Sequence, residues 1–112
     1  MKAVFYDGEK RWIADTKEDE FLFGTPVNPP NTRTTYTRGT DLFVHRTKSG
    51  KVYLYFLDWS LWQGEEDRIR EATVEEAQKF LERWLSSPWG PSEEELSRFK
   101  ELTGIDLLEE TA

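Results

Sequence analysis

Two periodicities divide the chain. In the first part, apolar and polar residues alternate over short segments separated by turn-forming residues, a pattern typical of β-strands. The earliest two segments flank Asp7-Gly8, a dipeptide that favours a tight hairpin turn. Residues 21–24 (FLFG) predict a third strand. Residues 34–38 (TTYTR) predict a polar edge strand after the proline-rich loop at residues 25–32 (TPVNPPNT).

The longest β-pattern is at residues 41–58 (DLFVHRTKSGKVYLYFLD), which predicts two strands connected at Ser49-Gly50. We expect Lys48 to lie opposite Lys51. This register pairs Arg46 with Tyr53, Val44 with Tyr55 and Leu42 with Leu57 on one face, and His45 with Leu54 and Phe43 with Phe56 on the other. Both faces are largely apolar, so we expect a central hairpin that is covered on each side.

The last part of the chain has helical periodicity. Thr73 with Glu76, and Ser92 with Glu95, each fit a capping box, in which a hydroxyl and a glutamate three residues later bind backbone N–H groups. Apolar residues recur after each box at the spacing of one helical face. Gly104 is placed as a left-handed C-terminal cap. The sequence therefore predicts two helices.

A series of strands followed by helices predicts an α+β fold. We expect one domain over residues 1–112, mainly β in residues 1–64 and mainly α in residues 65–112, with a short strand at residues 68–72. The sheet should be antiparallel, with four to six strands, and both helices should pack on one of its faces. A chain of 112 residues can bury one core without support from disulfides or metals.

The net charge of −7 is unevenly placed. Residues 1–64 carry 9 cationic and 8 acidic side chains, whereas residues 65–112 carry 6 and 14. The acidic second part repels nucleic acid and anionic lipid, so any nucleic-acid site should lie in the first part. Asparagine, glutamine and methionine are scarce while glutamate is plentiful, which is a bias seen in thermophile proteins.

Residue types exclude several kinds of chemistry. The sequence has no cysteine, which excludes disulfides, thiol nucleophiles and thiolate metal sites, and it has no glycine-rich phosphate loop. The acids at residues 65–67 lack the spacing of a calcium loop, so we expect no metal and no cofactor. The N-terminus lacks the apolar run of a signal peptide, and no segment has the length and apolarity of a membrane span. We therefore expect a cytoplasmic protein.

The segment at residues 58–67 (DWSLWQGEED), which we call the corner, is open to two interpretations. In the first, Trp59 and Trp62 seal the core where a strand ends, and Gly64 permits a tight turn. In the second, the two tryptophans form an aromatic slot in which Gln63 offers its amide to a ligand or a partner peptide.

Residues 43–85 contain an aromatic hairpin, the tetrapeptide WQGE at residues 62–65, and the helical segment TVEEAQKFLERWL. This combination resembles a pattern in short uncharacterised prokaryotic proteins. That group has no known activity. The resemblance therefore implies that the corner recurs, and it assigns no function to any residue.

The single histidine, His45, also has two interpretations. It is either a core or interface side chain, or the general base of a hydrolase or lyase. A catalytic base needs an orienting partner, and Asp41 or Asp58 could supply one from the same hairpin.

Cations and tyrosines are interleaved between residues 33 and 55. Exposed tyrosines beside cations can bind single-stranded nucleic acid, because bases stack on the rings. The residues of this alternative site are Tyr36, Arg46, Lys51, Tyr53 and Tyr55. The other interpretation of the same residues is an ordinary polar sheet face.

The sequence contains five tryptophans and seven phenylalanines, more than we expect a small core to need. Excess aromatic residues mark interfaces. We therefore predict a small non-enzymatic binding module for a protein partner or for self-association. Trp62 and Trp89 are the predicted exposed anchors, with Trp59 and Gln63 beside Trp62. Nucleic-acid binding and chemistry at His45 are the alternatives.

Overall fold

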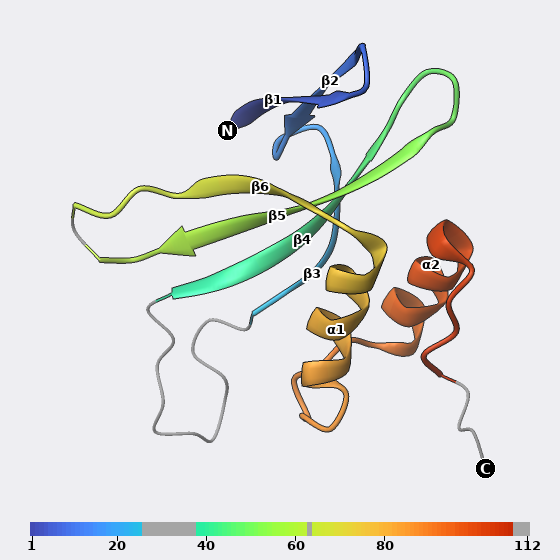
Figure 1. The fold of residues 1–112 in the computed structure, drawn as a ribbon. Coiled ribbons are helices and arrows are strands. Elements are labelled where there is room, and N and C mark those ends of the chain that lie inside the picture. Colours follow the sequence, from blue (N-terminus) through green and yellow to red (C-terminus); the bar gives the residue numbers. More distant parts are fainter. Residues whose placement is uncertain (26–37, 63, 109–112) are drawn as a thin grey trace.

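The computed structural model describes residues 1–25, 38–62 and 64–108. Its elements in chain order (Figure 1) are β1 (Lys2–Asp7), β2 (Lys10–Asp15), β3 (Glu20–Gly24), β4 (Arg38–Arg46), β5 (Val52–Ser60), β6 (Arg68–Ala72), α1 (Val74–Trp84) and α2 (Glu93–Thr103). The paired strands are antiparallel and both helices follow them, so the predicted α+β class is confirmed. The proline-rich loop after Thr25 and most of the predicted strand at residues 34–38 lie outside the described residues.

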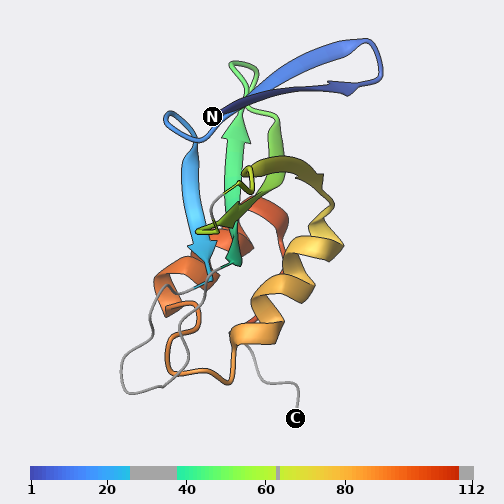
Figure 2. The same cartoon turned by 90° about the vertical axis from the view of Figure 1, so that its left-hand side faces the viewer.

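The six strands form two sheets rather than the single sheet that we expected. β1 and β2 form a separate hairpin, while the other four strands form a sheet in the order β3-β4-β5-β6. The hairpin packs on a sheet face because its inner side is apolar: Phe5, Trp12 and Ala14 all contact the core. Figures 1 and 2 show the hairpin at the same end of the molecule as the turn between β4 and β5.

Two cores lie on the two faces of the four-stranded sheet. On one face α1 and α2 cover the helix-side core, which consists of Leu22, Phe23, Leu42, Val44, Leu54, Phe56, Ala77, Leu81 and Phe99. On the other face the hairpin covers the hairpin-side core, which consists of Trp12, Ala14, Phe43 and Tyr55. The prediction that the helices cover one face and that the central hairpin is buried on both sides is therefore correct.

The predicted register of the central hairpin is wrong by one residue. Arg46 pairs with Val52 instead of Tyr53, and Val44 pairs with Leu54 instead of Tyr55. The cause is the turn, in which Gly50 has a φ of 89° and its N–H donates to the Thr47 carbonyl. This is a three-residue loop with glycine in the left-handed region, not the two-residue loop that we assumed.

The register error exchanges the faces of every β5 side chain relative to β4. His45 lies opposite Tyr53, and Phe43 lies opposite Tyr55. Both tyrosines therefore share the hairpin-covered face with His45, and Leu54 and Phe56 point toward the helices.

Both helices begin and end as their local sequence predicts. The capping boxes at Thr73 and Ser92 are complete, with the side chains of Glu76 and Glu95 accepting the return hydrogen bonds. Gly104 caps α2 with a φ of 81°. These features were predictable because each depends on residues within one helical turn.

The hairpin covers only one end of its sheet face. Its strands have six residues each, whereas β4 and β5 have nine each. Trp12 stacks on Tyr53 at 4.6 Å and on His45 at 5.3 Å, both near the β4–β5 turn. Asp41 and Trp59 lie beyond the hairpin-side core, toward the opposite end of the same face.

Replacement of Trp12 by alanine should destabilise the fold by about 3–5 kcal/mol, because the side chain is buried between the hairpin and the sheet. The control is Ile13→Ala, at an adjacent residue that is 44% exposed on the outer face of the hairpin, with an expected loss below about 1 kcal/mol. Urea unfolding followed by far-ultraviolet circular dichroism measures the free energy of unfolding of both variants. Equal losses would contradict the role given to Trp12.

Candidate functional site

The uncovered end of the sheet face forms a groove of about 520 Å³, which we call the sheet-face groove. Its walls are apolar side chains from β3, β5 and the corner, namely Phe21, Leu57, Trp59 and Leu61. Two carboxylates, Asp41 and Asp67, line the same groove. Apolar walls with a few polar groups are the usual composition of a binding site.

Two glycines leave room for Trp59 and Asp41, which line the groove. Trp59 lies opposite Gly39, and a Cβ atom at position 39 would collide with the indole ring. A Cβ atom at Gly24 would collide with the carboxylate of Asp41. The absence of both side chains lets the indole and the carboxylate lie flat on the sheet, where the Trp59 Nε1–H donates to Asp41 Oδ1 at 3.1 Å.

Asp41 is held in an environment that disfavours its charge. Partial burial raises the pKa of Asp41 above its ordinary value, and the negative charge of Asp67 raises it further, while the hydrogen bond from Trp59 opposes the shift. Among the described residues, no cation pairs with Asp41. A carboxylate in this state can interact strongly with a positive group brought by a ligand.

The rim of the groove is apolar and exposed. Phe21 is 54% exposed, Leu61 is 63% exposed and Trp62, the next residue along the chain, is 56% exposed. Gly64 turns the corner with a φ of 87°, and the carboxylate of Asp67 accepts a hydrogen bond from the Ser60 N–H. The strand ends at the corner, as the first interpretation expects, but Trp62 is exposed and does not seal the core. The second interpretation depends on Gln63, which lies outside the described residues, and it stays a prediction.

The four predicted partner-binding residues are placed differently from one another. Trp59 lines the groove and Trp62 is exposed beside it, whereas Gln63 lies outside the described residues. Trp89 is half-buried in the connection between α1 and α2, at the bottom of Figure 1, so it is less accessible than the exposed anchor that we expected, and its role in binding stays a prediction. The sequence did not indicate Phe21, Asp41 or Leu61 as part of this surface.

His45 belongs to a hydrogen-bonded cluster under the hairpin. Its Nδ1 lies 2.9 Å from Asp19 Oδ1, and the Tyr55 hydroxyl donates to Asp19 Oδ2 at 2.7 Å. Burial and the neighbouring Asp19 raise the pKa of Tyr55, which keeps this hydroxyl a donor. Trp12 stacks on the imidazole. The cluster joins the loop before β3 to the sheet, which is a structural role.

The predicted carboxylate partners of His45 are wrong. Asp58 points to the helix-covered face, where Arg70 donates to it at 2.6 Å, and Asp41 faces the groove. The partner is Asp19, which is 26 residues from His45 in sequence and could not be identified from strand alternation. His45 does not line the sheet-face groove.

The predicted tyrosine platform for nucleic acid is disrupted by the true register. Tyr55 is fully buried, and one ring face of Tyr53 is stacked on Trp12. Lys51 pairs with Asp7, which also accepts a hydrogen bond from the Tyr53 hydroxyl at 2.7 Å. Arg46 is exposed, and Tyr36 lies outside the described residues.

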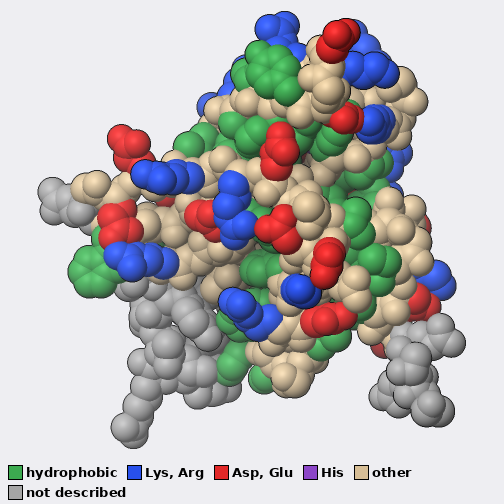
Figure 3. Space-filling model, in the orientation of Figure 1, with side chains coloured by type: hydrophobic (Ala, Val, Ile, Leu, Met, Phe, Trp, Pro, Cys, Tyr) green, Lys and Arg blue, Asp and Glu red, His purple; other side chains and the backbone are tan. Residues whose placement is uncertain are grey.

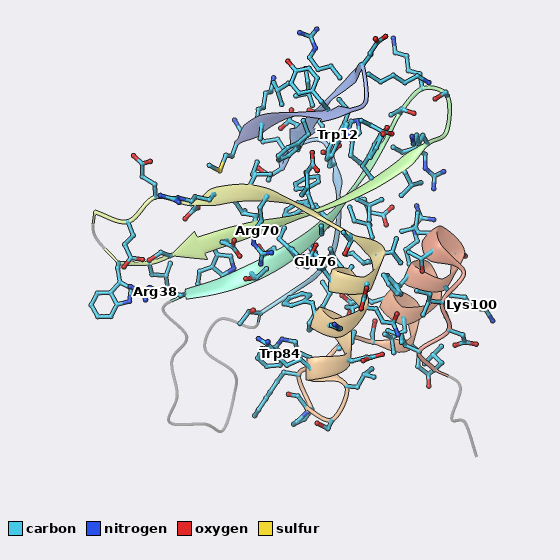
Figure 4. The ribbon with its side chains drawn as sticks, in the orientation of Figure 1. Trp12, Arg38, Arg70, Glu76, Trp84 and Lys100 are labelled. Atoms are coloured by element: carbon cyan, nitrogen blue, oxygen red, sulfur yellow. The ribbon has the colours of Figure 1, made fainter. Side chains whose placement is uncertain are left out.

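A larger cleft of about 660 Å³ lies on the other face of the sheet, between β4–β6 and α1. Arg70 lies over the Phe56 ring at 4.4 Å and approaches Glu76 of α1 at 4.0 Å. Figure 3 shows cationic and acidic side chains intermingled across this face, and Figure 4 shows Arg70 close to Glu76, with Arg38 farther along the sheet. The lining of this cleft carries both signs of charge, and Arg38 pairs with Glu65 while Arg70 pairs with Asp58, so these charges partly offset one another.

Comparison of the chain with protein-family models, with curated proteins and with solved structures gives no match. The resemblance of residues 43–85 to other proteins therefore stays a prediction. No group of three or more potential metal ligands occurs among the residues that the structure describes. Within the same described ranges, neither helix is long and apolar enough to cross a membrane.

Replacement of Asp41 by asparagine should raise the midpoint of thermal unfolding at pH 7. The raised pKa means that folding favours the protonated form of Asp41. The contribution of Asp41 to the free energy of unfolding is therefore fully present below its ordinary pKa of 3.8, and it is lost as the pH rises through the pKa of the folded state. Asparagine keeps an oxygen that accepts from Trp59 but carries no charge at any pH. The advantage of the variant should therefore shrink as the pH falls toward 3.8.

Thermal unfolding of both proteins at several pH values measures this difference. Glu66→Gln, which removes one charge from an exposed residue on the opposite cleft, is the control. A variant that is less stable than the wild type at pH 7 would contradict the assignment.

Proposed function

We propose that the protein is a non-enzymatic binding module that holds a segment of a protein partner in the sheet-face groove. The observation that carries this proposal is the gathering of large exposed apolar side chains on the rim, where Phe21, Leu61 and Trp62 are each more than half exposed. Exposed apolar patches of this kind mark interaction surfaces, and tryptophan is among the residues that dominate binding energy at interfaces.

The shape of the groove favours a chain segment as its occupant. The groove runs across one face of the sheet from β3, an edge strand, to the corner after β5. It is open along its length, whereas sites for small molecules usually enclose most of the ligand. An extended peptide can lie along an open groove beside an edge strand and place alternate side chains in it. Self-association through the same surface is a version of this proposal.

The two alternatives have less support. Nucleic-acid binding by the tyrosine-bearing face loses Tyr55 to the core and part of Tyr53 to Trp12. A hydrolase or lyase centred on His45 gains an orienting carboxylate in Asp19, but the imidazole is stacked against Trp12 under the hairpin and lines neither the sheet-face groove nor the larger cleft. The sequence without cysteine suits a reducing compartment, and we propose a cytoplasmic location.

Replacement of Leu61 by aspartate should reduce recovery of the partner from a lysate of the host cells at least tenfold, because it places a charge on the apolar rim. The matched control is Tyr6→Asp, at a residue 65% exposed on the hairpin, against 63% for Leu61. Both residues are exposed, so both variants should fold, which circular dichroism checks.

The experiment is a tagged pull-down with and without nuclease, with sedimentation of the purified protein to detect self-association. We expect a partner, or a dimer, that survives nuclease and is lost only in Leu61→Asp. Recovery that Leu61→Asp leaves unchanged, or material released by nuclease, would sink the proposal.

A further inference from the structure

The two carboxylates of the groove, Asp41 and Asp67, form no ion pair with a described cation, unlike Asp58 of β5 and Asp7 of β1. Asp58, one position before Trp59 on β5, is bound by Arg70, and Asp7 is bound by Lys51. Asp41 and Asp67 form no ion pair with any residue in the described ranges. Each uses its Oδ1 atom to accept one hydrogen bond, from Trp59 and from the Ser60 N–H respectively.

The walls of the groove supply no positive charge either. Its lining residues from the described part of the chain include no lysine, arginine or histidine. Asp41 therefore lies half-buried among apolar side chains, where a charge without a partner is costly, and the exposed Asp67 adds a second negative charge to the same groove. The pKa of Asp41 is raised accordingly, by burial and by the charge of Asp67.

On the basis of the proposed function, we infer that the groove selects a partner segment in which a lysine or arginine is flanked by apolar side chains, with the cation held by Asp41 and Asp67. The charge of such a segment is complementary to the groove. The aliphatic stem of the lysine or arginine side chain fits the apolar walls at Leu57 and Trp59, since long cationic side chains commonly cover apolar surface with their stems. The flanking apolar side chains reach the rim at Phe21 and Leu61.

Two features explain why the groove favours a cation over a purely apolar side chain. The Oδ2 atoms of both aspartates accept no hydrogen bond from described residues, so each can accept one from an ammonium or guanidinium group. The Trp59 indole is fixed by its bond to Asp41 and by the glycine beneath it, so the ring is preorganised for stacking against a cation.

The test uses three synthetic peptides that differ at one position: acetyl-Ala-Leu-Lys-Leu-Ala-amide and the same peptide with norleucine or glutamate in place of lysine. Binding is measured by two-dimensional NMR titration of the ¹⁵N-labelled full chain, with the Trp59 indole resonance as the reporter. We expect the lysine peptide to shift this resonance saturably. The norleucine peptide, of similar length without the charge, should bind about tenfold more weakly, and the glutamate peptide should not bind.

Charge-neutral variants test whether Asp41 and Asp67 are the groups that bind the lysine side chain. Asp41→Asn and Asp67→Asn keep an oxygen for their present hydrogen bonds, and each should weaken the lysine peptide about tenfold while leaving the norleucine peptide unchanged. The control is Glu66→Gln, at the sequence neighbour of Asp67, which removes the same charge from the wall of the other cleft and should change binding less than twofold.

Equal binding of the lysine and norleucine peptides, or no binding of any peptide to the wild type, overturns the inference. An unchanged affinity for the lysine peptide in both asparagine variants overturns it as well. These failures are distinguishable from a failure of the proposed function, which is read from the effect of Leu61→Asp on partner recovery and does not depend on a cation.

Discussion

The contact of Trp12 with the sheet decides how much of one sheet face is covered. Figure 2 shows the β1–β2 hairpin at the end of the sheet near the β4–β5 turn, where it extends sideways rather than along β4. Trp12 stacks on His45 and Tyr53 and so holds the hairpin at the β4–β5 turn. Among the described residues, no element covers the far end of this face, and the sheet-face groove lies there.

The two ends of this face treat their carboxylates differently. Under the hairpin, Asp19 is held by His45, by the Tyr55 hydroxyl and by the Asp15 N–H, so its burial is compensated. At the open end, Asp41 receives one hydrogen bond from Trp59 and no cation from the described residues. The carboxylate under the hairpin is therefore fully hydrogen-bonded within the protein, whereas the carboxylate at the open end keeps an oxygen that can accept a hydrogen bond from a ligand.

Much of the fold was predictable because its signals are local. The capping boxes and Gly104 depend on neighbouring residues, and they were predicted correctly. The register was not, since it depends on Gly50 adopting a left-handed conformation in a three-residue loop. Of the residues at the groove, the sequence pointed only to Trp59 and its neighbour Trp62. Phe21 and Asp41 were missed because strand pairing across the sheet brings them to this surface. Asp19 reaches His45 across 26 residues, a distance that no sequence periodicity reports.

The central claim, that the hairpin seals one end of the sheet face and leaves the other open, is tested most directly by the indole N–H signals of Trp12 and Trp59. A soluble paramagnetic agent broadens the NMR signals of groups that it can approach, and both signals appear in one spectrum, assigned with Trp12→Phe and Trp59→Phe. The account predicts strong broadening for Trp59, which lines the groove, and little for Trp12, which is 5% exposed. Equal protection of both indoles, or greater broadening of Trp12, would contradict it.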